Sequence, residues 1–278
     1  MKSKSQANKK NNILILDGGG SSLKAFVQTE SSLKLKVKYK GNFNVQTGQR
    51  DKILNTISLM IKQFPSEYVK IGLAGLVEKK DASWLVKEFI GKKISVMSDV
   101  DLAIDIHFQG GDGMLAILGT GSIFAAKAGQ KKVKIGGYGS AIGDVGSGYA
   151  IGQEAVRTYL QLLDGFAKDA IFEAAMKKFF RTKADAVRKI YHEHFELQHL
   201  APVVFMCAAQ ESAVAMKIID YQTSLVVRYI EHLRRRIGRN LPLCLVGGLT
   251  EHKTQYVERL KEKLKNININ LHLGNGES

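Results

Sequence analysis

The feature that most constrains the fold is a strand that ends in a glycine turn and returns as a second strand, and this arrangement occurs twice. The first copy spans residues 13–28 around the glycines at 18–20, and the second spans residues 113–127 around Gly119 and Gly121. The residues after each turn lack helical periodicity, so each turn is predicted to join two strands. We therefore expect two structural repeats of similar design.

Elsewhere the chain alternates apolar runs of strand length with segments of helical periodicity, which is typical of an α/β fold. Further strands are predicted at 34–39, 68–71, 93–97, 243–246 and 267–273. Helices are predicted at 51–64, 81–89, 99–107 and 253–265, and the segment from 167 to 241 is expected to be mainly helical. The pattern restarts near residues 107–110. This places one domain at 13–108 and a second, with a helical insert, at 109–278, after a basic tail at 1–12 that is expected to be disordered.

Composition argues against several classes of function. The net charge is +15, from 41 Lys and Arg against 26 Asp and Glu, but the basic groups are not interleaved with the aromatic residues that a single-strand nucleic-acid binder uses for stacking. We expect a solvated, lysine-rich surface and no nucleic-acid partner. No apolar run is long enough to span a bilayer and no signal-like apolar segment precedes Ile13, so no membrane partner is expected.

The two cysteines indicate a reducing compartment. Cys207 and Cys244 lie far apart, lack the paired spacing of a zinc site and cannot form a disulfide framework. A cytoplasmic protein is therefore expected.

The first glycine turn has the composition of a phosphate-binding segment. Consecutive glycines let backbone N–H groups approach an anion, and nearby hydroxyl and ammonium groups add donors. The residues concerned are Asp17, Gly18, Gly19, Gly20, Ser21, Ser22 and Lys24. The carboxylate of Asp17, at the strand end, is placed to hold Mg²⁺ directly or through water. The segment is not a P-loop, which needs Gly-Lys-Ser/Thr before a helix, and an ordinary tight hairpin is the alternative interpretation.

Two later glycine segments could also bind parts of a nucleotide. The second turn consists of Gly119, Thr120, Gly121 and Ser122, and together the two turns suggest phosphates held between two lobes. Gly247 and Gly248 follow the strand at 243–246, where glycines would let an adenine ring lie flat on the backbone. A plain strand–helix turn explains this last pair equally well.

The order of these motifs resembles a known family. The segments are DGGGSSLK from Asp17, GLAG from Gly72, LGTGS from Leu118, GGYGSAIGDVGSGYAIG from Gly136 and LVGG from Leu245. They resemble the N-acetylglucosamine kinase family, whose bacterial members include BadF/BadG-type ATPases, within the superfamily of sugar kinases, heat-shock 70 proteins and actin. The resemblance runs from Ile13 to about Gly248. It implies an actin-like ATPase fold, in which two ribonuclease-H-like domains hold the nucleotide in the cleft between them.

The resemblance also implies roles for single residues. Asp99, which follows Met97 and Ser98, resembles the catalytic base of the family. The residues that resemble sugar-binding positions are Asn44, Gly75, Gly137 and Asp144. The implied cofactors are ATP and Mg²⁺, and the implied partner is a small amino sugar. Relatives are commonly homodimers.

The chemistry of phosphoryl transfer also explains these residue types independently of the resemblance. The protein mainly positions groups and neutralises charge, and a carboxylate at Asp99 can accept the proton of the attacking hydroxyl. Asn44 and Asp144 offer directional partners to sugar hydroxyls. The structural alternatives are a helix N-cap for Asp99 and a loop cap for Asp144.

We therefore expect a sugar kinase that phosphorylates a hexosamine, such as N-acetylglucosamine or a glucosamine-like sugar, with Asp99 as general base. The first alternative is a non-catalytic ATP-binding sensor or assembly factor of the same fold. The second is an ATP-driven activator of 2-hydroxyacyl-CoA dehydratases, which needs cysteines that bridge an iron–sulfur cluster. His192 and His194 could suggest a metal site, but their spacing does not share a helix face, and a solvated helix face is expected there.

Overall fold

The computed structural model of the chain describes residues 12–20, 22–30, 32–76, 78–251 and 254–272. The chain divides into two compact units, one that ends at Gly110 and one that begins at Gly111. Each unit contains one β-sheet with helices, which confirms the expected α/β class. The predicted basic tail, apart from Asn12, lies outside the described residues.

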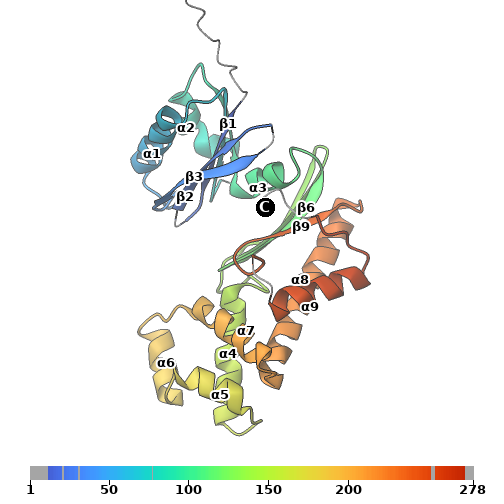
Figure 1. Cartoon of the computed structure of the whole chain (residues 1–278). Coiled ribbons are helices and arrows are strands. Elements are labelled where there is room, and N and C mark those ends of the chain that lie inside the picture. Colours follow the sequence, from blue (N-terminus) through green and yellow to red (C-terminus); the bar gives the residue numbers. More distant parts are fainter. Residues whose placement is uncertain (1–11, 21, 31, 77, 252–253, 273–278) are drawn as a thin grey trace, which may run out of the picture. The chain divides into compact units, whose positions relative to one another are not determined.

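The first unit is built on a five-stranded sheet in the order β3-β2-β1-β4-β5 (Figure 1). The strands are β1 (Ile13–Gly18), β2 (Ser22–Gln28), β3 (Leu33–Lys40), β4 (Tyr68–Leu73) and β5 (Lys93–Ser98). Strand β2 is antiparallel to both β1 and β3, whereas β4 and β5 run parallel to β1. The helices are α1 (Arg50–Gln63), the 3₁₀ helix η1 (Lys79–Ala82), α2 (Ser83–Lys87) and α3 (Asp99–His107).

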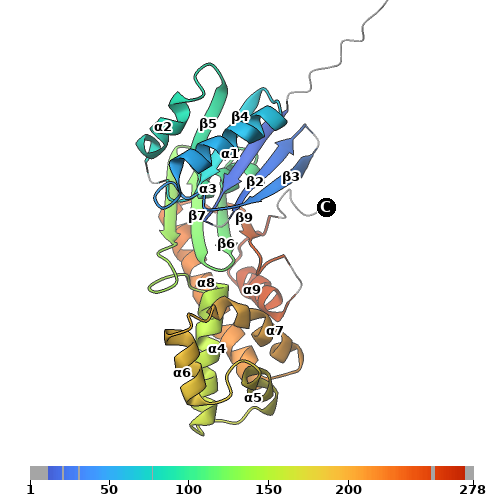
Figure 2. The same ribbon diagram turned by 90° about the vertical axis from the view of Figure 1, so that its left-hand side faces the viewer.

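Alternation along β1 gives this sheet two different faces. Leu14 and Leu16 are fully buried in a core that also contains Ile53 and Ile57 of α1, and Figure 2 shows α1 lying over the sheet. Because successive side chains of a strand point to opposite faces, Asp17 lies on the face away from this core.

Helix α3 packs on the same face as Asp17. Gly72 of β4 is in register with Asp17. A Cβ atom added to Gly72 would lie 2.5 Å from the Cδ2 atom of Leu102 in α3, so the helix approaches the strand as closely as a glycine allows. This close contact fixes the position of α3 and hence of its first residue, Asp99.

The second unit repeats the strand order on a four-stranded sheet, β8-β7-β6-β9. Its strands are β6 (Gly113–Leu118), β7 (Ser122–Ala128), β8 (Lys131–Gly136) and β9 (Leu243–Val246). An isolated parallel bridge between Leu243 and Leu271 occupies the place that β5 has in the first unit. The sequence-based expectation of two similar repeats is confirmed by this shared order of strands.

The helices of the second unit form one continuous core with the sheet. They are α4 (Gly148–Leu163), α5 (Ala170–Lys177), α6 (Lys183–Tyr191), the 3₁₀ helix η2 (Leu197–Leu200), α7 (Ala201–Ala209), α8 (Ala213–Ile237) and α9 (Gln255–Asn266). The prediction of a mainly helical segment from 167 to 241 is confirmed.

Two details of the secondary-structure prediction were wrong. Strand β8 was missed, because its alternating Lys-Lys-Val-Lys-Ile pattern stands directly before a glycine-rich segment. The last strand, predicted at 267–273, is reduced to the single bridge at Leu271 among the described residues.

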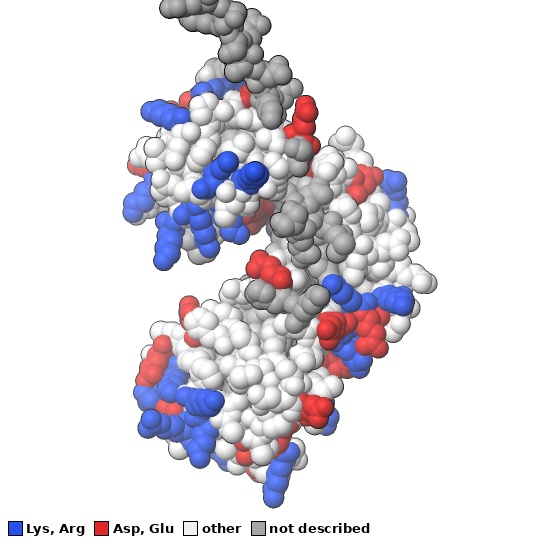
Figure 3. Space-filling model, viewed as in Figure 1, with Lys and Arg blue, Asp and Glu red and all other residues white. Residues whose placement is uncertain are grey.

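Basic side chains are spread over the surface of both units. Figure 3 shows them over both units, with acidic groups beside many of those of the second unit. On β3, Lys34, Lys36, Lys38 and Lys40 are all exposed along an edge strand, where lysine discourages pairing with other chains. Within the described part of the chain, no helix is long and apolar enough to cross a membrane.

Candidate functional site

Asp17 lies at the end of the central strand of the first unit, directly opposite Lys24 of β2. Burial raises the pKa of the Asp17 carboxyl, the Lys24 ammonium lowers it, and the Asp99 carboxylate raises it again. Asp17, Lys24 and Asp99 are therefore close enough to interact electrostatically. The structure brings together the predicted magnesium ligand and the predicted base.

Asp99 is the first residue of α3, and the residue before it forms the N-cap of the helix. Ser98 occupies the N-cap position, where its Oγ accepts a hydrogen bond from the N–H of Asp101 at 3.1 Å. The Asp99 Oδ1 atom accepts one from the N–H of Val100 at 2.9 Å. The alternative interpretation of Asp99 as the N-cap is thus wrong, because Ser98 performs that function.

The first glycine turn is a tight hairpin. The N–H of Gly19 donates to the Ser22 carbonyl at 2.8 Å, and the Gly19 carbonyl accepts from Phe43 at 2.9 Å. Gly18 lies against the Leu73 side chain, whereas nothing within 4 Å would obstruct a Cβ atom at Gly20, which is exposed. Ser21 lies outside the described residues. Since Gly19 uses its N–H within the hairpin, Gly20 is the glycine whose backbone a phosphate could approach most closely.

Asn44 and Gly75, predicted from separate motifs to bind the sugar, are neighbours. A Cβ atom added to Gly75 would lie 2.2 Å from the Asn44 Oδ1 atom, and Gly75 has a φ of +75°, which favours glycine. The same Oδ1 atom accepts a hydrogen bond from the N–H of Gln46 at 2.8 Å, and the Gln46 side chain donates to the Gly75 carbonyl at 3.1 Å. These bonds hold the Asn44 side chain in one orientation.

In the second unit, the turn after β6 is joined to the start of α4. The N–H of Gly148 donates to the Gly119 carbonyl at 2.8 Å, and the N–H of Tyr149 donates to the Thr120 carbonyl at 3.2 Å. Two N–H groups at the helix start, which have no partner within the helix, are thereby satisfied by the turn. The helix fixes the shape of the predicted phosphate segment.

Asp144 lies against this turn. Its Oδ2 atom would be 2.7 Å from a Cβ atom added to Gly121, and its backbone has the positive φ of +59°. The N-cap of α4 is Ser147, whose Oγ accepts from the N–H of Ala150 at 3.1 Å, so the carboxylate of Asp144 is not needed to cap the helix. The hydroxyl of Ser122 donates to the Val145 carbonyl at 2.8 Å and so holds the same loop.

Buried side chains of α8 and α9 hold the loop around Gly146 through hydrogen bonds. The sequence analysis did not identify them. Gln222 Oε1 accepts from the N–H of Gly146 at 3.0 Å, and the Tyr256 hydroxyl donates to the Gly146 carbonyl at 2.6 Å. Gln222 is 4% exposed and Tyr256 is fully buried, and burial raises the pKa of the Tyr256 hydroxyl well above its ordinary value. In the sequence, the only sign of such a role was a polar side chain on an otherwise apolar helix face.

Gly247 and Gly248 lie next to the second turn. A Cβ atom on Gly247 would be 2.5 Å from the Leu118 carbonyl oxygen, and the residue has a φ of +105°. Nothing within 4 Å would meet a Cβ atom on Gly248. Gly137 is farther along the chain, with a φ of +71°, and packs against the Ile123 side chain.

A pocket of about 400 Å³ lies within the second unit and contains three of the predicted residues. Its lining consists of Thr120, Gly121, Ser140, Asp144, Tyr149, Ile190, His194, Phe195, Glu196, Leu197 and Gln198. The expectation of a solvated helix face at His192 and His194 was right about their exposure and wrong about the helix. α6 ends at Tyr191, and His194 follows in a loop with a φ of +52° that borders the pocket.

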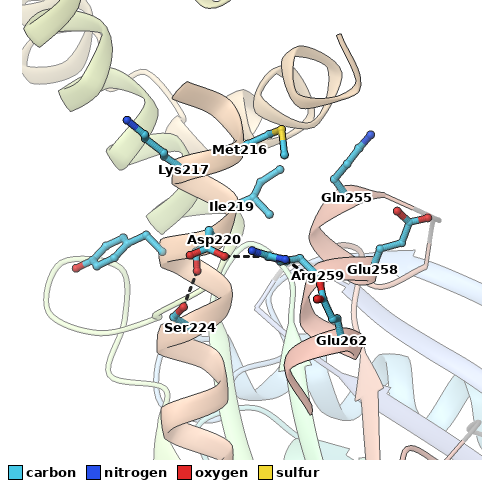
Figure 4. A pocket seen from close by; sticks show the side chains of 10 residues that line it. Met216, Lys217, Ile219, Asp220, Ser224, Gln255, Glu258, Arg259 and Glu262 are labelled. Carbon is cyan, nitrogen blue, oxygen red and sulfur yellow. Dashed lines mark hydrogen bonds and ion pairs between the residues drawn. The ribbon is translucent and has the colours of Figure 1, made fainter. Parts of the chain in front are cut away.

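A larger pocket, about 620 Å³, lies between α8 and α9 (Figure 4). None of the predicted site residues lines it. Its charged walls pair with each other, since Arg259 forms ion pairs with Asp220 at 2.9 Å and with Glu262 at 2.8 Å. We assign no part of the site to this pocket.

The motifs and their arrangement agree with a comparison against known families. The model of the BadF/BadG/BcrA/BcrD ATPase family matches residues 16–273. The chain belongs to this family. The resemblance stated from the motifs is therefore confirmed.

Characterised relatives of this ATPase-family chain include amino-sugar kinases. An N-acetylmuramic acid/N-acetylglucosamine kinase from Clostridium acetobutylicum is 24% identical over 279 residues, which cover 92% of this chain and 90% of the relative. The glucosamine kinase GspK of Vibrio cholerae is 21% identical over 250 residues, which cover 85% and 84% of the two chains.

Solved structures share the fold. A candidate N-acetylglucosamine kinase from Chromobacterium violaceum has a TM-score of 0.71 at 21% identity over 96% of each chain. A ROK family glucokinase from Streptomyces griseus, in complex with glucose and AMPPNP, has a TM-score of 0.59 at 16% identity and covers 94% of this chain. The predicted actin-like ATPase fold is confirmed.

The cysteines of this family member argue against an iron–sulfur activator. Cys207 and Cys244 are 0% and 1% exposed. Burial raises the pKa of the Cys207 thiol, as does the nearby Asp169 carboxylate, which disfavours the thiolate that a cluster needs. A cluster shared between subunits would require accessible thiolates.

The donor set of the first unit suits Mg²⁺ better than a transition metal. No group of three or more His, Cys, Asp or Glu side chains that could hold a metal occurs among the described residues. Mg²⁺ usually takes one or two carboxylates and completes its shell with water and phosphate oxygens. Asp17 fits this role, because a cation would offset both its burial and the repulsion from Asp99.

Proposed function

We propose that this protein transfers the γ-phosphoryl group of ATP to a hydroxyl of a hexosamine. The observation that carries the proposal is a pair of carboxylates at the carboxyl ends of β1 and β5, the two strands on either side of β4. Asp17 lies near the end of β1 and Asp99 directly follows β5, and the two interact electrostatically. Family membership supports ATP as the donor, and the names of the relatives support an amino sugar as the acceptor.

Asp99 is proposed as the general base. Its Oδ1 atom is held by the N–H of Val100, which leaves Oδ2 to take the proton from the attacking sugar hydroxyl. The Gly72–Leu102 contact keeps the helix, and therefore this carboxylate, in place. Asn44, Gly75 and Asp144 would bind the sugar through directional hydrogen bonds.

The glycine turns are the proposed ATP-binding segments. Gly20, Ser22 and Lys24 of the first unit and Gly119 to Gly121 of the second would bind phosphate oxygens, and Gly247 and Gly248 would lie beside the adenosine. Mg²⁺ supplies charge neutralisation to the phosphates when bound, with Asp17 as the residue that holds it. A cytoplasmic location and a homodimer belong to the same proposal.

The proposal is tested by measuring ADP release from ATP in the presence of single sugars. The panel contains glucose, glucosamine, N-acetylglucosamine, N-acetylmannosamine and N-acetylmuramic acid, and nucleotide binding is measured in parallel by calorimetry. We expect sugar-dependent ADP release with at least one hexosamine. ATP binding without turnover on any sugar would instead favour the non-catalytic sensor, and the absence of ATP binding would overturn both.

A further inference from the structure

The pocket of the second unit has a wall that the proposed mechanism does not use. Thr120, Gly121 and Asp144 form one side of the pocket, and residues 194–198, between α6 and α7, form the other. These residues come from the helical segment, about fifty residues farther along the chain than Asp144.

The wall approaches the turn after β6 because α4 carries two glycines on one face. A Cβ atom added to Gly152 would lie 1.8 Å from the Leu197 carbonyl oxygen, and one added to Gly148 would lie 3.4 Å from the Gln198 Cβ atom. Residues four apart share a helix face, so both glycines contact the same segment. Gly148 also donates to the Gly119 carbonyl. Only Gly148 therefore separates the start of the Gln198 side chain from Gly119 of the proposed phosphate turn.

The wall is held rigidly at its apolar residues. The Phe195 ring packs edge-on against Phe180 at 5.1 Å and Phe179 at 6.2 Å, and Leu197 is 5% exposed. The N–H of Phe195 also donates to the Lys189 carbonyl at 3.0 Å. Rigid positions on either side fix the backbone from which His194 and Gln198 extend.

The polar groups of the pocket can distinguish substituents. Gln198 is half-buried and supplies an amide donor and an acceptor, His194 supplies an imidazole, and Ser140 a hydroxyl. Ile190 and Tyr149 add apolar surface beside them. Glu196 also lines the pocket, but its side chain is exposed and its carboxylate lies 3.3 Å from His199 Nε2. The remaining groups suit a neutral substituent that has both a donor and an acceptor, such as an acylamino group.

We infer that Gln198, together with His194, determines which ring substituent of the sugar this protein accepts. The inference rests on the proposed function, because it assumes that the sugar occupies the pocket beside Asp144. It adds that discrimination comes from the helical segment, whereas Asp99 and the glycine turns act on any sugar that binds. A site that hydrogen-bonds a substituent loses specificity when that bond is removed.

The test compares kcat/KM for N-acetylglucosamine and glucose in the wild type and in Gln198→Met, which keeps the side-chain length but removes its hydrogen bonds. The expected result is a fall of about tenfold in the ratio of the two values, the effect of one lost hydrogen bond. His194→Asn, in which Asn tolerates the positive φ, should lower the ratio as well. His192→Ala is the matched control, since His192 is exposed and does not line the pocket.

The outcomes separate this inference from the proposed function. If the wild type transfers phosphate but kcat/KM for both sugars falls together in Gln198→Met, the wall is only structural and the inference is wrong. An unchanged ratio in both variants also overturns it. A wild type that phosphorylates no sugar defeats the proposed function itself. Thermal unfolding of each variant shows whether a loss of activity reflects a loss of folded protein.

Discussion

Asp17 has a charged side chain at a position that the surrounding residues partly shield from water. Burial raises the pKa of its carboxyl, Lys24 offsets part of that effect, and Asp99 adds repulsion. An acid whose pKa is raised by folding makes the folded state less stable as the pH rises from the unfolded-state pKa through the folded-state pKa, and the full cost is present above the latter. Such a cost is typical of residues kept for function, because a neutral side chain would serve the fold better.

Asp17→Asn is therefore expected to raise the free energy of unfolding at neutral pH. Below the ordinary carboxyl pKa of 3.8 the group is protonated in both states, so the gain should shrink as the pH falls and disappear there. Urea unfolding at a series of pH values from neutral to acid measures this difference. As a control, Asp51→Asn removes an exposed carboxylate from the first turn of α1, where negative charge is favourable, and should give no gain. A less stable Asp17→Asn protein at neutral pH would contradict the argument.

Helix α3 is the element that positions the proposed base, and its distance from β4 is set by Gly72. The Leu102 Cδ2 and Cβ atoms would lie 2.5 and 2.6 Å from a Cβ atom at that position, closer than real contacts allow. Any side chain at Gly72 must therefore displace the helix or the leucine. Asp99 begins this helix, so a displaced helix moves the carboxylate.

Gly72→Ala is expected to reduce kcat more than it weakens ATP binding, and to cost about 1–3 kcal/mol of stability through overpacking. The variant Leu102→Ala removes the atoms that clash, so the double variant should recover part of the lost kcat. Steady-state kinetics and calorimetric ATP titration of the two single variants and the double variant measure this coupling. If the double variant shows simply the product of the two single effects, Gly72 does not act through Leu102.

Across the whole molecule, local structure could be predicted from the sequence, whereas contacts between residues far apart in the sequence could not. The two strand–glycine–strand segments were found because strand and turn signals are local, and their repetition predicted the shared strand order. Strand β8 was missed although its lysines alternate with apolar residues as in β3, because it stands directly before a glycine-rich segment. His194 and Gln198 could not be placed in the pocket, because their approach depends on the packing of a distant segment against Gly148 and Gly152. Likewise, Tyr256 is identified as the support of Gly146 only by the packing of α9.

The central claim is that Asp99 removes the proton of the accepting hydroxyl during phosphoryl transfer. The most direct measurement is the single-turnover rate of transfer from ATP to the accepted sugar in the wild type and in Asp99→Asn, with the Kd for ATP determined on the same samples. The account predicts that the rate falls by about a hundredfold or more, the usual range for loss of a general base, while the Kd stays unchanged. A variant that transfers phosphate at the wild-type rate would contradict the account.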